Sequence, residues 1–256
     1  MPHPEPLPTP SACLSRRTRP LAACLLAWAC APTWAAHPLQ SEDTGTQGPG
    51  NVEWENGLGW TRAAGVQVFS FQPQLSYGIR PEVDLILQPS WLRQPDARGR
   101  GDTQVDVKWR FFGESPLSLG VRAGFAVPSG NDRLGLPPGT VAAHGVLIAT
   151  YDEAPWTVHA NIGMDRNPAT SGVRRHLWRV STAVQWTAND RLVWALDAGV
   201  SADPDPARRR RPATLLAGAV YTLSPGLDVD VGYQVSIGAQ PSARQWLAGL
   251  TYRFAP

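Results

Sequence analysis

The stretch Leu227-Asp-Val-Asp-Val-Gly-Tyr-Gln-Val-Ser-Ile237 decides the fold class, because apolar and polar residues alternate along it without a break. Successive side chains of a β-strand point to opposite faces of the sheet. One face of this stretch carries Leu, Val, Val, Tyr, Val and Ile, and the other carries Asp, Asp, Gly, Gln and Ser. The pattern therefore predicts a strand that separates an apolar medium from a polar one.

The same alternation recurs along most of the chain. Strands of about 9 to 15 residues suit a tilted crossing of a membrane. We predict twelve strands, over residues 51–60, 65–79, 82–93, 102–113, 117–127, 141–152, 155–165, 174–188, 190–201, 213–223, 226–238 and 244–254.

The connections between these strands fall into two sets that alternate. The short set comprises residues 80–81, 113–116, 152–155, 188–190 and 224–226, and the long set comprises 94–101, 128–140, 166–173 and 202–212. Outer-membrane barrels have short periplasmic turns and longer outer loops. The chain is therefore expected to be all-β, forming a closed antiparallel up-and-down transmembrane β-barrel over residues 51–254, with both ends of the barrel on the periplasmic side.

Trp and Tyr residues tend to lie near the ends of the predicted strands, as Trp60, Trp91, Trp156 and Trp246 do. Aromatic girdles at the two membrane interfaces explain this placement. The alternative is that aromatic residues simply favour strands. A soluble sandwich would need a second sheet to cover these faces.

Residues 1–36 have the pattern of a signal peptide. Arg16, Arg17 and Arg19 precede the apolar run 21–31, which is too short for a stop-transfer helix, and small residues lead to a cleavage site after Ala36. The alternative is a buried N-terminal helix. An exported chain without a later apolar helix can still enter a membrane as a closed barrel, so we expect a location in the outer membrane of a Gram-negative bacterium.

Composition narrows the function further. All three cysteines, Cys13, Cys24 and Cys30, lie in this leader, so the remaining chain would have neither disulfides nor thiolate metal sites. Removing the leader also removes three arginines and one glutamate, which leaves 23 − 3 = 20 basic and 21 − 1 = 20 acidic residues. This neutrality argues against nucleic acid as a partner.

Charged residues on the polar faces are the candidate functional residues. Arg or Lys on a lipid-facing position costs about 2–4 kcal/mol at mid-membrane, so these side chains should point into the lumen. The same parity turns His159, Asp165, Arg179 and Arg191 inward. The candidates for lining a pore are Glu53, Glu55, Asp84, Asp106, Lys108, Arg110, Arg122, Asp197, Asp228, Asp230 and Arg253.

Strand pairing predicts two charge clusters. About the turn at 113–116, Arg122 should lie diagonal to both Asp106 and Lys108. Where the first and last strands meet, Arg253 should lie near Glu53 and Glu55 on one side, and near Asp228 and Asp230 on the other.

These charges have two interpretations. They could line a narrow aqueous path and set its field, or they could fill and rigidify the lumen as paired charges. Eight strands give a filled interior and sixteen an open channel, so twelve strands leave both open. The polar segment 37–50 is expected to be either a plug of the lumen or a periplasmic tail.

Two loops deserve separate interpretations. The loop at 128–139 is the expected constriction, with Ser129, Asn131, Asp132 and Arg133 as its polar residues. The four consecutive arginines at 208–211 could bind lipopolysaccharide phosphates, because guanidinium groups suit phosphate. The alternative that we favour is a solvated loop tip partly neutralised by Asp203 and Asp205.

An enzyme is not expected. Some outer-membrane barrels hydrolyse lipids with Ser and His, but the chain has no Gly-x-Ser-x-Gly motif, and His144, His159 and His176 lie in no convincing catalytic pattern. No cluster of His, Asp and Glu has metal-ligand spacing. We therefore expect no metal and no cofactor.

Short motifs resemble the outer-membrane protein family named for the meta-pathway of phenol degradation. Residues 37–48 resemble the start of its mature members, with Asp43, Gly45, Thr46 and Gly48 at matching positions, before an acidic first strand. The phrase at 125–132 resembles its mid-chain motif, with Ser129 where Thr is usual. The end at 250–254 resembles the terminal strand that barrel-assembly machinery reads, although Ala255 and Pro256 follow the aromatic residue that normally ends the chain.

The resemblance implies a porin-like channel or transporter for passive passage of small molecules, and the name of the family adds hydrophobic or aromatic solutes. It implies no residue-level substrate site. The alternatives are a structural or adhesive barrel without transport, and a lipid-modifying barrel enzyme. The expected partners are outer-membrane lipid and lipopolysaccharide, barrel-assembly machinery through the last strand, and a small-molecule solute.

Overall fold

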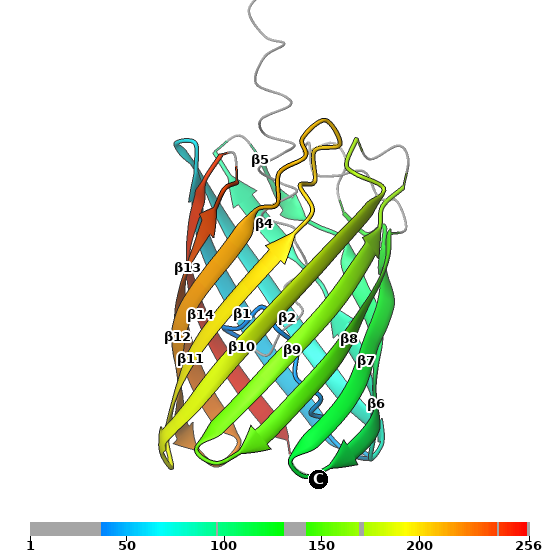
Figure 1. Cartoon of the computed structure of the whole chain (residues 1–256), viewed down its shortest axis with the longest axis vertical. Coiled ribbons are helices and arrows are strands. Elements are labelled where there is room, and N and C mark those ends of the chain that lie inside the picture. The colour runs from blue at the N-terminus through cyan, green and yellow to red at the C-terminus, as the bar shows by residue number, and fades with distance from the viewer. Residues whose placement is uncertain (1–36, 96, 131–141, 169–171, 240, 255–256) are drawn as a thin grey trace, which may run out of the picture.

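The computed structural model describes residues 37–254, apart from residues 96, 131–141, 169–171 and 240 (Figure 1). The expected signal peptide and the loop residues Asn131, Asp132 and Arg133 lie outside the described residues. Among the residues that are described, no helix is long and apolar enough to cross a membrane.

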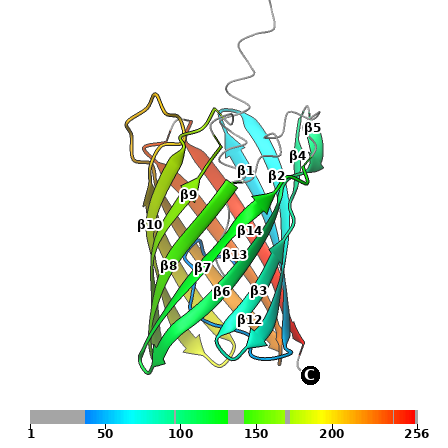
Figure 2. The ribbon, with the colours of Figure 1, turned by 90° about the vertical axis from the view of Figure 1, so that its right-hand side faces the viewer.

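Twelve antiparallel strands form a closed barrel, because the first strand pairs with both the second and the last (Figures 1 and 2). The predicted fold class is therefore confirmed. The barrel strands are β1 (Val52–Ala63), β2 (Val66–Arg80), β3 (Val83–Gln88), β6 (Thr103–Glu114), β7 (Leu117–Val127), β8 (Ala142–Glu153), β9 (Trp156–Arg166), β10 (His176–Asn189), β11 (Leu192–Ser201), β12 (Ala213–Ser224), β13 (Leu227–Ile237) and β14 (Ala243–Phe254).

Two further strands correct the prediction for residues 82–101. The strand predicted over 82–93 is interrupted after Gln88, and its continuation is β4 (Trp91–Gln94), which pairs with β2 and with β5 (Ala97–Arg100). The region expected to be an irregular loop at 94–101 is thus a hairpin at the outer rim. Pro89 has no N–H to donate to the ladder, which accounts for a break at this point.

The barrel is apolar outside and polar inside, as the alternation predicts. On β13, Val231 faces outward and is 59% exposed, whereas its neighbour Asp230 is 4% exposed and faces the lumen. Ile162 and Leu196 also face outward and are exposed, while Arg122 is wholly buried inside. Such an outer surface is stable only where lipid replaces water around it.

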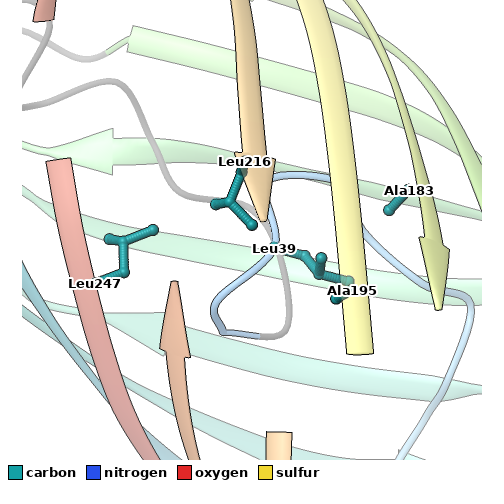
Figure 3. Packing of buried hydrophobic residues seen from close by; sticks show 5 residues of the cluster. All are labelled: Leu39, Ala183, Ala195, Leu216 and Leu247. Carbon is teal, nitrogen blue, oxygen red and sulfur yellow. The ribbon is translucent and has the colours of Figure 1, made fainter. Parts of the chain in front are cut away.

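Residues 37–50 precede β1 and run through the interior of the barrel, where the blue trace is visible in two perpendicular views (Figures 1 and 2). We call them the N-terminal segment. Leu39 of this segment packs against inward-facing Ala183, Ala195, Leu216 and Leu247, which come from β10, β11, β12 and β14 (Figure 3). This small apolar patch packs the segment against one wall of an otherwise polar lumen.

Candidate functional site

The candidate functional site is the lumen together with the N-terminal segment that occupies it. Asp197 of β11 holds the backbone of this segment, because one of its carboxylate oxygens accepts hydrogen bonds from the Gln40 and Ser41 amides, each at 2.7 Å. Asn161 of β9 binds both backbone polar groups of the next residue, Glu42. Its side chain accepts from the Glu42 amide at 2.5 Å and donates to the Glu42 carbonyl at 2.9 Å.

A buried cluster of charges lies beside this anchor. Glu42 Oε1 is 2.6 Å from Arg122 Nη1, and its other oxygen is 3.5 Å from Lys108 Nζ. Arg122 also contacts Asp106 at 2.7 Å, and the opposite oxygen of Asp106 is 2.7 Å from His144 Nε2. The carboxylate of the segment thus lies between two cations of the wall, where a low dielectric strengthens each interaction.

One expectation about this cluster is corrected. Arg122 lies diagonal to Asp106, but it is directly opposite Lys108 rather than diagonal to it. The cause is a register shift in β6 between Arg110 and Phe112, which inserts one extra residue on that strand. Two cations directly opposite each other repel, and Glu42 supplies the countercharge.

The next residues of the segment follow the wall towards the short turns. Asp43 Oδ1 is 3.0 Å from Lys108 Nζ and accepts the Gly45 amide at 2.6 Å. Burial would raise the pKa of the Asp43 carboxyl, but the Lys108 ammonium and these hydrogen bonds hold that pKa below its usual range. Asp84 of β3 then accepts the Gln47 amide, at 3.1 Å to each oxygen.

The other end of the segment lies against β12 and β13. His37 Nδ1 is 2.5 Å from Asp230 Oδ1, and Gln40 donates a hydrogen bond to Gln234. Pro38 sits on a flat part of the wall, since a Cβ added at Gly232 would be 3.0 Å from the Pro38 Cβ. Glycine at this position therefore allows the chain to approach the barrel wall closely.

The predicted seam cluster is present in part. Arg253 of β14 contacts Glu53 of β1 at 2.8 Å and Asp228 of β13 at 2.6 Å. In the described part of the chain it forms no ion pair with Glu55 or Asp230, which bind Gln74 and His37 instead. Glu55 and Asp230 each lie two residues further along their strands, deeper in the barrel, and the Arg253 side chain at the end of β14 does not reach them.

The remaining candidates lie at the two mouths of the barrel. Arg110 donates to the Pro81 carbonyl at 3.1 Å, beside a short turn. At the opposite mouth, Ser129 is hydrogen-bonded to Thr103 at 2.8 Å. The described residues of the predicted constriction, the loop at 128–139, are thus fixed to the rim of the barrel. Among the described residues, those that cross the lumen belong to the N-terminal segment.

Three other expectations concern inward-facing or loop residues. Asp165 and Arg179 form a pair at 2.7 Å inside the barrel. Arg191 was expected to face inward, but it lies exposed in the turn before β11. In the arginine-rich loop, Arg208 pairs with Asp205 at 3.1 Å, which agrees with the partly neutralised loop tip that we favoured.

Glu42 and His37 are the residues of the site that sequence reasoning missed. Both lie in a segment without periodicity, so strand parity could not place them. One signal was available. Lys108 and Arg122 face the same lumen from adjacent strands, and two buried cations lying opposite each other require nearby countercharge, which the carboxylates of the segment can supply.

Comparison with known proteins supports these assignments of fold. Residues 36–254 match the family described as "Putative MetA-pathway of phenol degradation". None of the curated proteins compared with the chain matches it. A likeness to solved structures exists at low sequence identity, and at such identity it shows the shared fold.

Two solved structures illustrate this likeness. One is an outer-membrane channel from Pseudomonas putida F1, with 11% identity and a TM-score of 0.67 over 83% of this chain and 98% of that chain. The other is the KdgM porin in complex with disordered oligogalacturonate, with 10% identity and a TM-score of 0.58 over 79% of this chain and 99% of that chain. The barrel described above is therefore the fold of bacterial outer-membrane channels.

Proposed function

This chain belongs to the family described as "Putative MetA-pathway of phenol degradation", and from that premise we propose that it is a channel for passive passage of small molecules across a bacterial outer membrane. The observation that carries the proposal is the closed barrel of twelve strands with an apolar outer face and a charged lumen. A barrel closed by hydrogen bonds leaves no free edge, and its inner face provides a polar route through lipid.

The N-terminal segment sets the width of that route. It is hydrogen-bonded to wall residues from β9, β11, β3 and β13, so it crosses the lumen rather than lining one side. Solute passes beside the segment or after part of it has left the wall. Most of its contacts are polar, and water can replace them when the segment moves.

The charged wall would act on the solute through its field. Asp106, Arg122 and Lys108 face the interior near the segment. Because these charges are paired with opposite charges, they favour solutes of low net charge. Hydrophobic or aromatic solutes are the class that the description of the family suggests. The KdgM porin was solved in complex with disordered oligogalacturonate, which indicates that a barrel of related fold admits a solute.

Single-channel conductance in a planar bilayer tests the proposal. The chain from His37 onward is compared with a chain that starts at Asn51, which lacks the N-terminal segment. We expect small discrete steps for the longer chain and larger ones for the shorter chain. Asp106→Asn should change the ion selectivity of the steps, whereas Arg253→Gln at the mouth should change it less.

Silence of both chains, each folded and inserted, would overturn the channel proposal and favour a structural barrel. Fractionation of cells that express the full chain tests the location separately. We expect the protein in the outer-membrane fraction, and its recovery elsewhere would contradict the proposed location whatever the conductance.

A further inference from the structure

Five arginines form an exposed group on the outward face of the barrel, at the end that carries the long loops. We call Arg62, Arg93, Arg98, Arg100 and Arg244 the arginine band. They come from β1, β4, β5 and β14, which are joined in the sheet by the pairings β14–β1, β1–β2, β2–β4 and β4–β5. Strands β4 and β5 stand beside β2 at the upper rim in Figure 2. All five side chains are exposed, and the parity of their strands turns them away from the lumen.

The band places like charges directly opposite one another. Arg62 is the cross-strand partner of Arg244, and Arg93 is the partner of Arg98. Like charges at opposed positions of a sheet destabilise it. None of these four arginines forms an ion pair with a described residue.

The strands around the band add no countercharge on their outward faces. The outward-facing positions of β1, β2, β4, β5, β13 and β14 carry no Asp or Glu in the described part of the chain. An anion placed between the opposed arginines would offset their repulsion.

A row of aromatic rings lies directly below the band, on the membrane side. Trp60 and Trp246 are opposed one outward-facing step below Arg62 and Arg244. Trp60 packs against Phe69 with ring centres 5.5 Å apart, and Trp246 packs against Tyr233 at 4.6 Å. Aromatic rings of this kind mark the membrane interface, which places the arginines at the level of lipid headgroups.

The row continues across the added hairpin. Phe71 packs against Trp91 with ring centres 5.6 Å apart, and Arg100 lies over the Trp91 ring at 5.9 Å from its centre. The surface thus presents cations at headgroup level, aromatic rings beneath them and aliphatic side chains further down, such as Leu58 and Val231. A lipid with anionic headgroups and several acyl chains is complementary to this order of chemistry.

We propose that the arginine band binds the phosphate groups of a phosphorylated glycolipid, lipopolysaccharide, in the outer leaflet. A guanidinium group donates two parallel hydrogen bonds to phosphate, so one phosphate between Arg62 and Arg244 converts their repulsion into two charge-assisted contacts. The acyl chains lie along the aromatic row. This proposal rests on the proposed outer-membrane location and does not depend on conduction through the barrel.

Native mass spectrometry of the full-length protein, expressed and purified from outer membranes, tests the site. The variant Arg62→Gln with Arg244→Gln is compared with the wild type and with Arg209→Gln plus Arg210→Gln. The latter control removes the same two charges from the exposed loop between β11 and β12. Electrophoresis of unheated samples in detergent verifies that each variant is folded, because a folded barrel resists the detergent and migrates differently from the unfolded chain.

We expect the variant in the band to retain roughly tenfold less lipopolysaccharide than the wild type, as the loss of charge-assisted phosphate contacts implies. The loop control should stay within about twofold. Equal retention by all three proteins would overturn the proposal. A loss confined to the loop control would assign binding to that loop and would also overturn it.

Two additions identify the source of the anion. Enzymatic removal of the lipid phosphates should abolish binding, and inorganic phosphate at the same phosphorus concentration should not compete. Displacement by inorganic phosphate would reveal a simple anion site and contradict the lipid assignment. A barrel that is silent in bilayers but retains lipopolysaccharide would overturn the channel proposal alone.

Discussion

Arg122 of β7 and Glu42 of the N-terminal segment meet inside the barrel, with 2.6 Å between Nη1 and Oε1 and both side chains buried. The two residues are 80 positions apart in the chain. Their contact joins the segment to the wall at the centre of the charge cluster, where Arg122 is shared with Asp106. The position of the segment in the lumen should therefore depend on this pair.

Glu42→Gln should loosen the N-terminal segment without unfolding the barrel. A buried hydrogen bond to a charged group contributes about 1.5–3 kcal/mol, which corresponds to a roughly 10- to 150-fold shift in the opening of the segment. The measurement is the rate of maleimide labelling at Ser41→Cys, a site that is 1% exposed. The chain from His37 onward has no native cysteine to interfere.

Asp190→Cys in an exposed turn is the matched control, and its labelling rate should be the same with Glu42 and with Gln at position 42. A labelling rate at residue 41 that is unaffected by Glu42→Gln would show that the pair does not hold the segment.

Gly232→Leu should displace Pro38 from the wall and increase conductance. The first carbon of the new side chain would already lie 3.0 Å from the Pro38 Cβ and 3.6 Å from the Leu247 Cβ, so the segment must move. Gly145→Leu adds the same group on the outward face, where no atom comes within 3.9 Å. Similar conductance steps from the two variants would contradict the close approach at Gly232.

Two inward-facing arginines should differ greatly in their effect on stability. Arg122→Met removes the cation that buried Glu42 and Asp106 share and leaves them only Lys108 and His144, which costs about 3–5 kcal/mol. Arg253→Met removes half-exposed ion pairs with Glu53 and Asp228, each worth about 0–1 kcal/mol. Urea unfolding of barrels refolded in liposomes measures both, and equal losses would argue against the buried cluster.

The lipid-facing surface should tolerate charge according to depth. Val231 lies near the middle of β13 and Ile237 at its outer end, and both face outward. Val231→Arg should cost about 2–4 kcal/mol and Ile237→Arg about 0–1 kcal/mol. The measurement is the urea midpoint of the folded barrel in liposomes. A reversed order would place the membrane differently along the strand.

Local chemistry determined what the sequence alone could predict. A strand places alternate residues on opposite faces, so the period of two in residues 227–237 assigned Val231 to lipid and Asp230 to the lumen. The alternation of short and long connections predicted the up-and-down order of the strands, because outer-membrane barrels have short turns on one side and longer loops on the other. The contact of Arg253 with Asp228 follows from pairing neighbouring strands.

Only the tertiary structure decided the rest, because the deciding contacts join distant residues. The register shift near Phe112 placed Lys108 opposite Arg122, and no periodic pattern announces an extra residue in a strand. The N-terminal segment has no period at all, so its path depends on wall residues such as Asn161 and Asp197. Closure of the barrel brought Arg62 beside Arg244, since only a closed sheet makes its first and last strands neighbours.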